Sequence, residues 1–174
     1  MDFFEVVEKR HSIRRFDKTK EIPEGDLNKI LETAIKAPSA GNRQAWDFII
    51  VKEHEIKKQL VKAALGQSFI AQAPVVVVVC ANQERSAMVY GRRGSELYCI
   101  QDTAIATQTM LLAITALGYG ACWVGAFNES AVREIVKIPS GSRPIAIIPI
   151  GMPVKIPPAT PRISLGELIH REHW

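Results

Sequence analysis

The sequence predicts an α+β protein in which helices flank a mixed β-sheet of about four or five strands. Residues 75–79 form an unbroken run of valines, which is typical of a strand that is covered on both faces. Several other segments carry apolar residues at helical spacing, and they alternate with short extended segments along most of the chain. A length of 174 residues fits one domain, which we expect to span residues 1–174.

The first half of the chain contains clear start and stop signals for helices. Asp2 and Glu5 form a capping pair for an N-terminal helix. A second helix is predicted to begin after Pro23 and to end near Ala37, because Pro38 disfavours helical backbone at the residue before it. The next predicted elements are a strand at 48–51, an amphipathic helix at 55–64 and the valine strand at 75–79.

The second half is dominated by one long helical segment, at residues 95–117. Its part at 104–117 is apolar or small on nearly every side, which is typical of a helix that is buried all round. One small domain cannot easily surround such a helix, so the pattern favours burial against a second copy of the protein. The polar, glycine-containing segment at 83–94 is interpreted as a surface loop.

The remaining elements are shorter. Gly118 ends the long helix, and residues 118–125 turn into a short strand. Asn128 caps a helix that continues to Val136, residues 144–150 form a further strand, and a capping pair at Ser164 and Glu167 begins a last helix.

Composition narrows the class of protein. A net charge of +4 is too small for the clustered basic surface of a nucleic-acid-binding protein. No apolar run approaches the length of about 20 residues that spans a bilayer, and the N-terminus lacks the pattern of a signal peptide. The three cysteines show no C-x-x-C spacing, so we expect reduced, buried thiols. These observations predict a cytoplasmic protein that binds neither nucleic acid nor membrane.

Several common catalytic patterns are missing. There is no phosphate-binding P-loop, and Gly118, Gly120 and Gly125 have the wrong spacing and context for a dinucleotide-binding loop. These glycines fit either a helix cap with a tight turn, or backbone N–H groups laid against a flat ligand. His170 and His173 fit a solvated helix end better than a metal site. No nucleophile motif supports a hydrolase.

The basic turn at residues 10–15 is the strongest local signal for a ligand. It contains three arginines, a histidine and a serine, and charge-assisted donors of this kind suit a phosphate dianion. The alternative is a solvated basic turn. Phe4 and Phe16 flank the segment as apolar anchors, which favours a fixed position for it.

Four motifs, in order along nearly the whole chain, resemble those of the nitroreductase family. Arg10-His11-Ser12-Ile13-Arg14-x-Phe16 resembles the first motif of that family, and residues 37–48 resemble its second motif, A-P-S-x-x-N-x-Q-P-W-x-F. Ala45 departs from this pattern, in which proline is usual. The segment from Asp102 to Phe127 is similar to the third motif, and the tail from Arg162 to Trp174 loosely matches the fourth.

The resemblance implies FMN at the interface of a homodimer, with contacts from both subunits. It implies that Arg10, His11, Ser12 and Arg14 hold the phosphate and ribityl oxygens, and that Arg162 adds a phosphate contact. Pro38, Ser39 and Asn42 are expected to approach the flavin from the partner subunit, and Trp123, Val124 and Gly125 to lie by its ring. Gln67 is a weaker candidate for a polar contact to the ring.

The implied reaction needs no catalytic side chain or metal, because the flavin carries the chemistry. NADH or NADPH is expected to pass a hydride to flavin N5 in a ping-pong cycle, after which a nitroaromatic, a quinone or a similar conjugated electrophile is reduced. Reductive dehalogenation, oxidative flavin chemistry and non-catalytic FMN storage remain alternatives. Arg92 and Arg93 belong either to a solvated loop or to a contact with the nicotinamide nucleotide or a charged acceptor.

Overall fold

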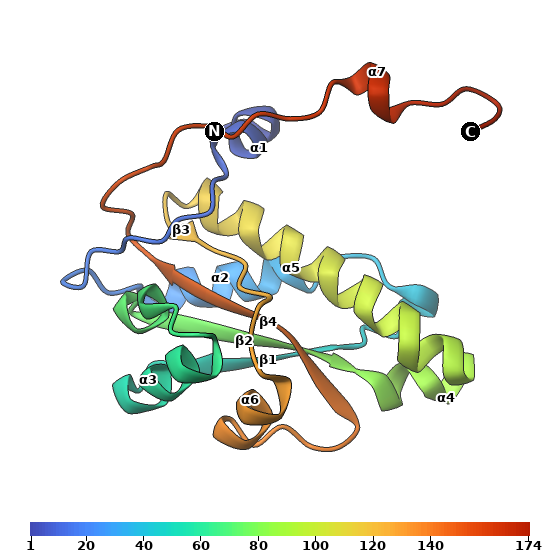
Figure 1. The fold of residues 1–174 in the computed structure, drawn as a ribbon, viewed down its shortest axis with the longest axis horizontal. Coiled ribbons are helices and arrows are strands. Elements are labelled where there is room, and N and C mark those ends of the chain that lie inside the picture. Colours follow the sequence, from blue (N-terminus) through green and yellow to red (C-terminus); the bar gives the residue numbers. More distant parts are fainter.

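A computed structural model describes residues 1–174 and shows a four-stranded sheet with helices on both faces (Figure 1). The strands run in the order β1-β2-β4-β3, and each neighbouring pair is antiparallel. The strands are β1 (Trp46–Val51), β2 (Val75–Asn82), β3 (Gly120–Ala121) and β4 (Ser142–Gly151). The sequence prediction of an α+β fold with about four strands is confirmed. The parallel component of the sheet is one isolated bridge, between Ser12 and Ala121.

Seven α-helices and three short helical turns complete the chain. The helices are α1 (Phe3–Lys9), α2 (Glu24–Ala34), α3 (His54–Ala63), α4 (Gln83–Arg93), α5 (Cys99–Ala116), α6 (Glu129–Ile135) and α7 (Leu165–Leu168). The short turns are η1 (Ala40–Asn42), η2 (Ser68–Gln72) and η3 (Gly94–Tyr98). Both predicted capping boxes are present, at Asp2 with Glu5 and at Ser164 with Glu167. No helix combines the length and the apolar character that crossing a membrane requires.

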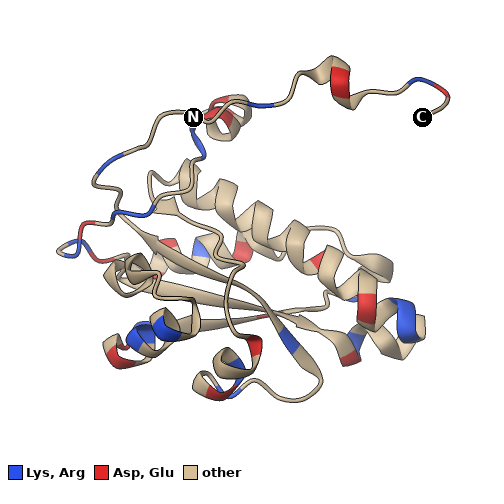
Figure 2. Cartoon of the chain, in the orientation of Figure 1, with Lys and Arg blue, Asp and Glu red and all other residues tan.

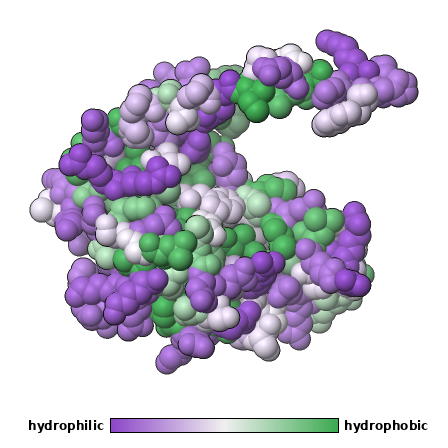
Figure 3. Space-filling model, in the orientation of Figure 1, coloured by the Kyte–Doolittle hydropathy of each residue, from purple (hydrophilic) through white to green (hydrophobic).

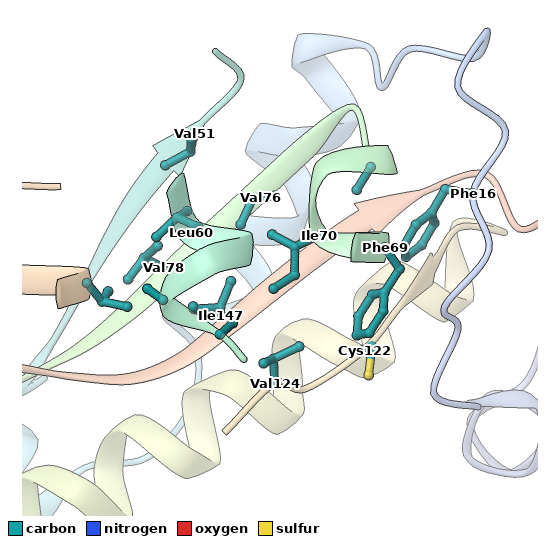
Figure 4. Close-up of a cluster of buried hydrophobic side chains, with 14 of the residues drawn as sticks. Phe16, Val51, Leu60, Phe69, Ile70, Val76, Val78, Cys122, Val124 and Ile147 are labelled. Carbon is teal, nitrogen blue, oxygen red and sulfur yellow. The ribbon is translucent and has the colours of Figure 1, made fainter. Parts of the chain in front are cut away.

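The core consists of two apolar layers separated by the sheet. On one face, α2 and α5 pack on alternate residues of β2 and β4, among them Val77 and Ile148. On the other face, α3, η2 and α6 cover a second cluster, which Figure 4 shows around Ile70, Val78 and Ile147. The residues of β2 from Val75 to Ala81 are all buried, so the prediction of a strand covered on both sides is confirmed.

Residues 83–94 form a helix instead of the predicted surface loop. The side chain of Asn82 caps α4 by accepting the N–H of Arg85. Ser86, which belongs to α4, is fully buried. Gly91, with a φ of 52°, interrupts the helical backbone before η3 begins. The prediction failed because the segment is strongly polar and contains a glycine at position 91, and its contacts with the rest of the protein hold it in place.

Helix α5 is the long helix that the sequence predicted, but a single chain does not bury it on all sides. Ile105 is 43% exposed, and Gln108 is also exposed. Figure 2 shows that the helix carries no lysine or arginine. At its C-terminus, the N–H groups of Gly118 and Tyr119 donate to the carbonyls of Thr115 and Ile114, the bonds of a Schellman cap.

Candidate functional site

The segment that contains the basic turn is fixed along the edge of β3. The N–H of Ile13 donates to the carbonyl of Ala121 at 2.8 Å, and Ser12 pairs with Ala121 in a parallel bridge. The side chain of Ile13 occupies the space where a Cβ on Gly120 would lie, so glycine at this position allows the close approach. The first and third motifs of the sequence are therefore neighbours in the fold.

The structure brings three of the predicted phosphate-binding residues to one cleft. Arg10, His11 and Arg162 all line an open cleft of about 540 Å³. The guanidinium of Arg162 donates to the carbonyl and the hydroxyl of Thr160, at 2.9 and 2.7 Å. Figure 2 shows basic residues on both the N-terminal segment and the C-terminal tail, which run near one another beside α1. The local charge suits an anion.

Cys122 is buried next to the same basic segment, and the residues of that segment affect the pKa of its thiol. Burial raises the pKa of the Cys122 thiol, while the charge of Arg14, a hydrogen bond from Ser12 and the more distant Arg10 act against that rise. Arg14 also extends over the ring of Phe69, with its guanidinium carbon 6.0 Å from the ring centroid. Cys122 is therefore close enough to Ser12, Arg14 and Arg10 for all three to influence its pKa. The three cysteines are free and buried, as the sequence predicted.

Residues 123–125 follow β3 and lie next to this basic region. Val124 is buried and exchanges two hydrogen bonds of 3.0 Å with Ile147, so its N–H is not free to donate to a ligand, while its expected place beside a flavin ring stays a prediction. The N–H groups of Trp123 and Gly125 donate to no protein acceptor. Gln67 lies close to them, and its side-chain amide donates to the carbonyls of Ala64 and Ala126.

The second motif lies at the opposite end of α5. The N–H of Ala40, between Ser39 and Asn42, donates to the carboxylate of Asp102 in the first turn of α5, at 3.0 Å. From Asp102 to Gly118 the helix rises by roughly 24 Å, and Figure 1 shows residues 36–44 at one end of α5 and β3 at the other. Within one chain, Pro38, Ser39 and Asn42 are therefore not brought together with the basic segment.

The loop at 38–44 has an unusual backbone. Gly41, Asn42 and Gln44 all have φ values between 50 and 53°. The left-handed region is costly for a glutamine, and such conformations concentrate at functional sites. The hydroxyl of Ser39 accepts the N–H of Gln44 at 2.9 Å, so this predicted ligand also holds the loop.

The sequence did not single out two charged residues that hold this loop. Asp102 is 4% exposed, burial raises its pKa against the opposing hydrogen bond from Ala40, and its second oxygen has no partner. It is the one charged residue in α5, which is a signal that the sequence offered. Arg85 donates to the loop from α4, and it was missed because the helix itself was not predicted.

The cations of the open cleft and the unpaired backbone N–H groups beside it are donors that suit an anionic ligand. Comparison with known proteins identifies the family. The profile described as "Nitroreductase family" matches residues 7–69 and 59–152. The chain belongs to the nitroreductase family.

Individual relatives agree with this assignment. The chain is 31% identical to a protein of Methanothermobacter thermautotrophicus that is provisionally named NADH dehydrogenase/NAD(P)H nitroreductase, over 100% of this chain and 88% of that one. It is 29% identical to an FMN reductase [NAD(P)H] of Bacillus subtilis, over 88% of this chain and 67% of that one. A crystal structure of a nitroreductase family protein from Clostridium novyi NT superposes with a TM-score of 0.80 and 34% identity, covering 88% of this chain and 86% of that one.

Proposed function

We propose that the protein is an FMN-dependent NAD(P)H oxidoreductase whose flavin lies between two copies of the chain. Family membership supports the class of enzyme, and the names of relatives that use NAD(P)H or reduce FMN support the donor and the cofactor. The observation that carries the proposal is the pairing of the Arg10–Arg14 segment with β3. This pairing supports a site in which the cations of that segment bind the phosphate beside the N–H groups of Trp123 and Gly125, which have no protein acceptor.

The residues of this region fit FMN. Arg10, His11, Ser12, Arg14 and Arg162 would hold the phosphate and the ribityl chain. Trp123 and Gly125 would offer backbone donors to the isoalloxazine ring, and Gln67, a weaker candidate, would make a polar contact with the ring. When bound, FMN supplies hydride transfer at its N5 atom, from NADH or NADPH to the acceptor. The protein's cations and N–H donors favour the negative charge that reduction puts on the ring.

A homodimer accounts for the separation between the two parts of the site. Two copies that pack with their α5 helices side by side in opposite directions would bring the 38–42 loop of one copy to the basic segment of the other. Pro38, Ser39 and Asn42 would then contact the flavin from the partner. The exposed Ile105 face of α5 would be buried in such a dimer.

Exposed apolar side chains at both termini also favour a partner. Phe3 and Phe4 are 64% and 77% exposed on α1, and Leu165 is 71% exposed on α7. Figure 3 shows the C-terminal tail extending beyond the body of the molecule, with apolar residues on its surface. Monomeric proteins seldom expose apolar residues in groups of this kind.

The acceptor is proposed to be a nitroaromatic, a quinone or another conjugated electrophile that stacks on the flavin. An anaerobic experiment tests the reaction. NADH or NADPH is expected to bleach the flavin absorbance, and a quinone or nitroaromatic added next should restore it. A bound flavin that neither nucleotide reduces at millimolar concentration contradicts the enzyme and favours FMN storage, the alternative from another class.

The phosphate assignment is tested by removing single arginines. Arg10→Ala and Arg14→Ala should each weaken FMN binding at least about tenfold, because losing a charged phosphate donor costs roughly 1.4 kcal/mol or more. Quenching of flavin fluorescence measures the dissociation constant. Arg15→Ala is the matched control, because Arg15 is an exposed neighbour that we do not assign to the site, and its substitution removes the same charge. Unchanged affinity in both site variants would show that the phosphate binds elsewhere.

A further inference from the structure

Helix α4 packs directly on the loop that we assign to the partner's flavin. The hydroxyl of Tyr90 lies over Gly41, where even a Cβ atom would overlap it. On the first turn of the same helix, Arg85 points toward residues 44–47 and contacts both backbone and side chain there. The loop of the second motif is therefore contacted by α4 through Tyr90 and Arg85, and by α5 through the carboxylate of Asp102.

Arg85 connects three acceptors with one guanidinium. Its Nη1 donates to the carbonyl of Gln44 at 2.6 Å and to the carbonyl of Trp46 at 3.1 Å. Its Nη2 donates to the carboxylate of Asp47 at 2.9 Å. A planar guanidinium is suited to this fixed set of directions, whereas an ammonium group cannot span it.

The contact with Gln44 acts at the most strained point of the loop. Gln44 has a φ of 50°, and a glutamine, which carries a Cβ atom, adopts this backbone only when its surroundings hold it there. The N–H of Gln44 is fixed by Ser39 and its carbonyl by Arg85, so both sides of this residue are tied. Ser39 and Asn42 depend on the same turn for their direction.

We propose that Arg85 is a positioning residue for the flavin site: from α4, it holds the 38–44 loop in the conformation that presents Ser39 and Asn42 to the flavin of the partner subunit. This inference rests on the proposed function. It gives α4 a role in cofactor binding, although no residue of α4 belongs to the motifs that resemble the family. The contacts of Arg85 are with residues 44–47, so its effect is on the fraction of protein molecules whose loop is in the binding conformation.

The experiment compares FMN binding in three variants of the full-length protein with that of the wild type. Arg85→Met removes the donors but keeps the length of the side chain, and the apparent FMN dissociation constant should rise at least about tenfold if the fraction in the binding conformation falls to a tenth. Asp47→Asn is the matched control, because it breaks the ion pair but leaves both carbonyl contacts of Arg85 in place. Arg85→Lys keeps one charged donor and should fall between wild type and Arg85→Met.

Thermal unfolding without FMN separates positioning from general stability. We expect Arg85→Met and Asp47→Asn both to lower the midpoint, and only the Arg85 variants to weaken FMN binding and to alter the visible circular dichroism of the saturated flavin. The inference is overturned if Arg85→Met binds FMN within about twofold of wild type, or if Asp47→Asn is weakened equally. If Arg85→Met does not fold, unchanged affinity in Arg85→Lys overturns it instead. A wild-type protein that binds no FMN contradicts the proposed function itself.

Discussion

Asp102 has an unusual environment for a carboxylate. It lies in an otherwise uncharged helix, accepts one N–H from the 38–44 loop and leaves its second oxygen without a partner. Burial raises its pKa, so the folded protein binds a proton more readily than the unfolded chain does. The stabilising effect of that proton is complete below the unfolded pKa, and it is lost as the pH rises through the higher folded pKa.

Asp102→Asn keeps a carbonyl acceptor for Ala40 and removes the buried charge. We expect its free energy of unfolding to exceed that of the wild type at neutral pH by on the order of 1 kcal/mol. The difference should shrink as the pH falls and the wild-type carboxyl takes up its proton. Urea unfolding at several pH values, at one protein concentration, measures it. A difference that stays constant with pH would contradict the assigned environment of Asp102.

Other residue-level properties were partly visible in the sequence. The basic turn was recognised because three arginines stand within six residues, and the structure places Arg10, His11 and Arg162 in one cleft. The backbone of Val124 pairs with β4, and the expected place of this residue beside a ligand stays a prediction. That pairing joins segments more than twenty residues apart, so no local pattern could indicate it.

At the scale of elements, two glycines with left-handed backbone have different surroundings. Gly118 caps α5, and nothing lies within 4 Å of the position of its missing Cβ. Gly41 has Tyr90 at that position. Alanine should cost about 1 kcal/mol at Gly118 from the backbone alone, and clearly more at Gly41, where overlap adds to the same strain. Urea unfolding of the two alanine variants provides the comparison.

Tyr90→Phe tests the cause of the difference, because it removes the hydroxyl that a Cβ on Gly41 would meet. In a Tyr90→Phe background, Gly41→Ala should lose less stability than in the wild type, by a coupling of about 0.5 kcal/mol or more. Equal losses in both backgrounds would mean that α4 does not press on the loop as described.

The elements that were predicted are those whose signals lie in residues close together in the sequence. The caps at Asp2 and Ser164 and the valine run of β2 are local signals, and each was found. Helix α4 was missed because its sequence is polar and is interrupted by Gly91, whereas the contacts that Arg85 makes with residues 44–47 are distant in the sequence. The antiparallel direction of the ladders also depends on pairing that spacing does not determine.

At the scale of the whole molecule, one helix organises the proposed site. The C-terminal end of α5 leads through Gly118 to the strand beside the basic segment, and its N-terminal end holds the 38–44 loop through Asp102. The length of α5 keeps these two groups apart in a single chain. The sequence predicted a second copy from the apolar character of α5 and from the family resemblance, and the structure adds this geometric reason.

The central claim, a flavin site shared between two chains, is tested most directly by mixing two defective variants. One variant carries Arg10→Ala and Arg14→Ala, and the other carries Ser39→Ala and Asn42→Ala. After the two variants are unfolded together in equal amounts and refolded, half of the dimers should be mixed, and each mixed dimer should contain one intact site and one doubly altered site. Fluorescence titration should then find about a quarter of the sites binding FMN with wild-type affinity. Mixed dimers that are detected by mass spectrometry but recover no tight site would contradict a shared flavin site.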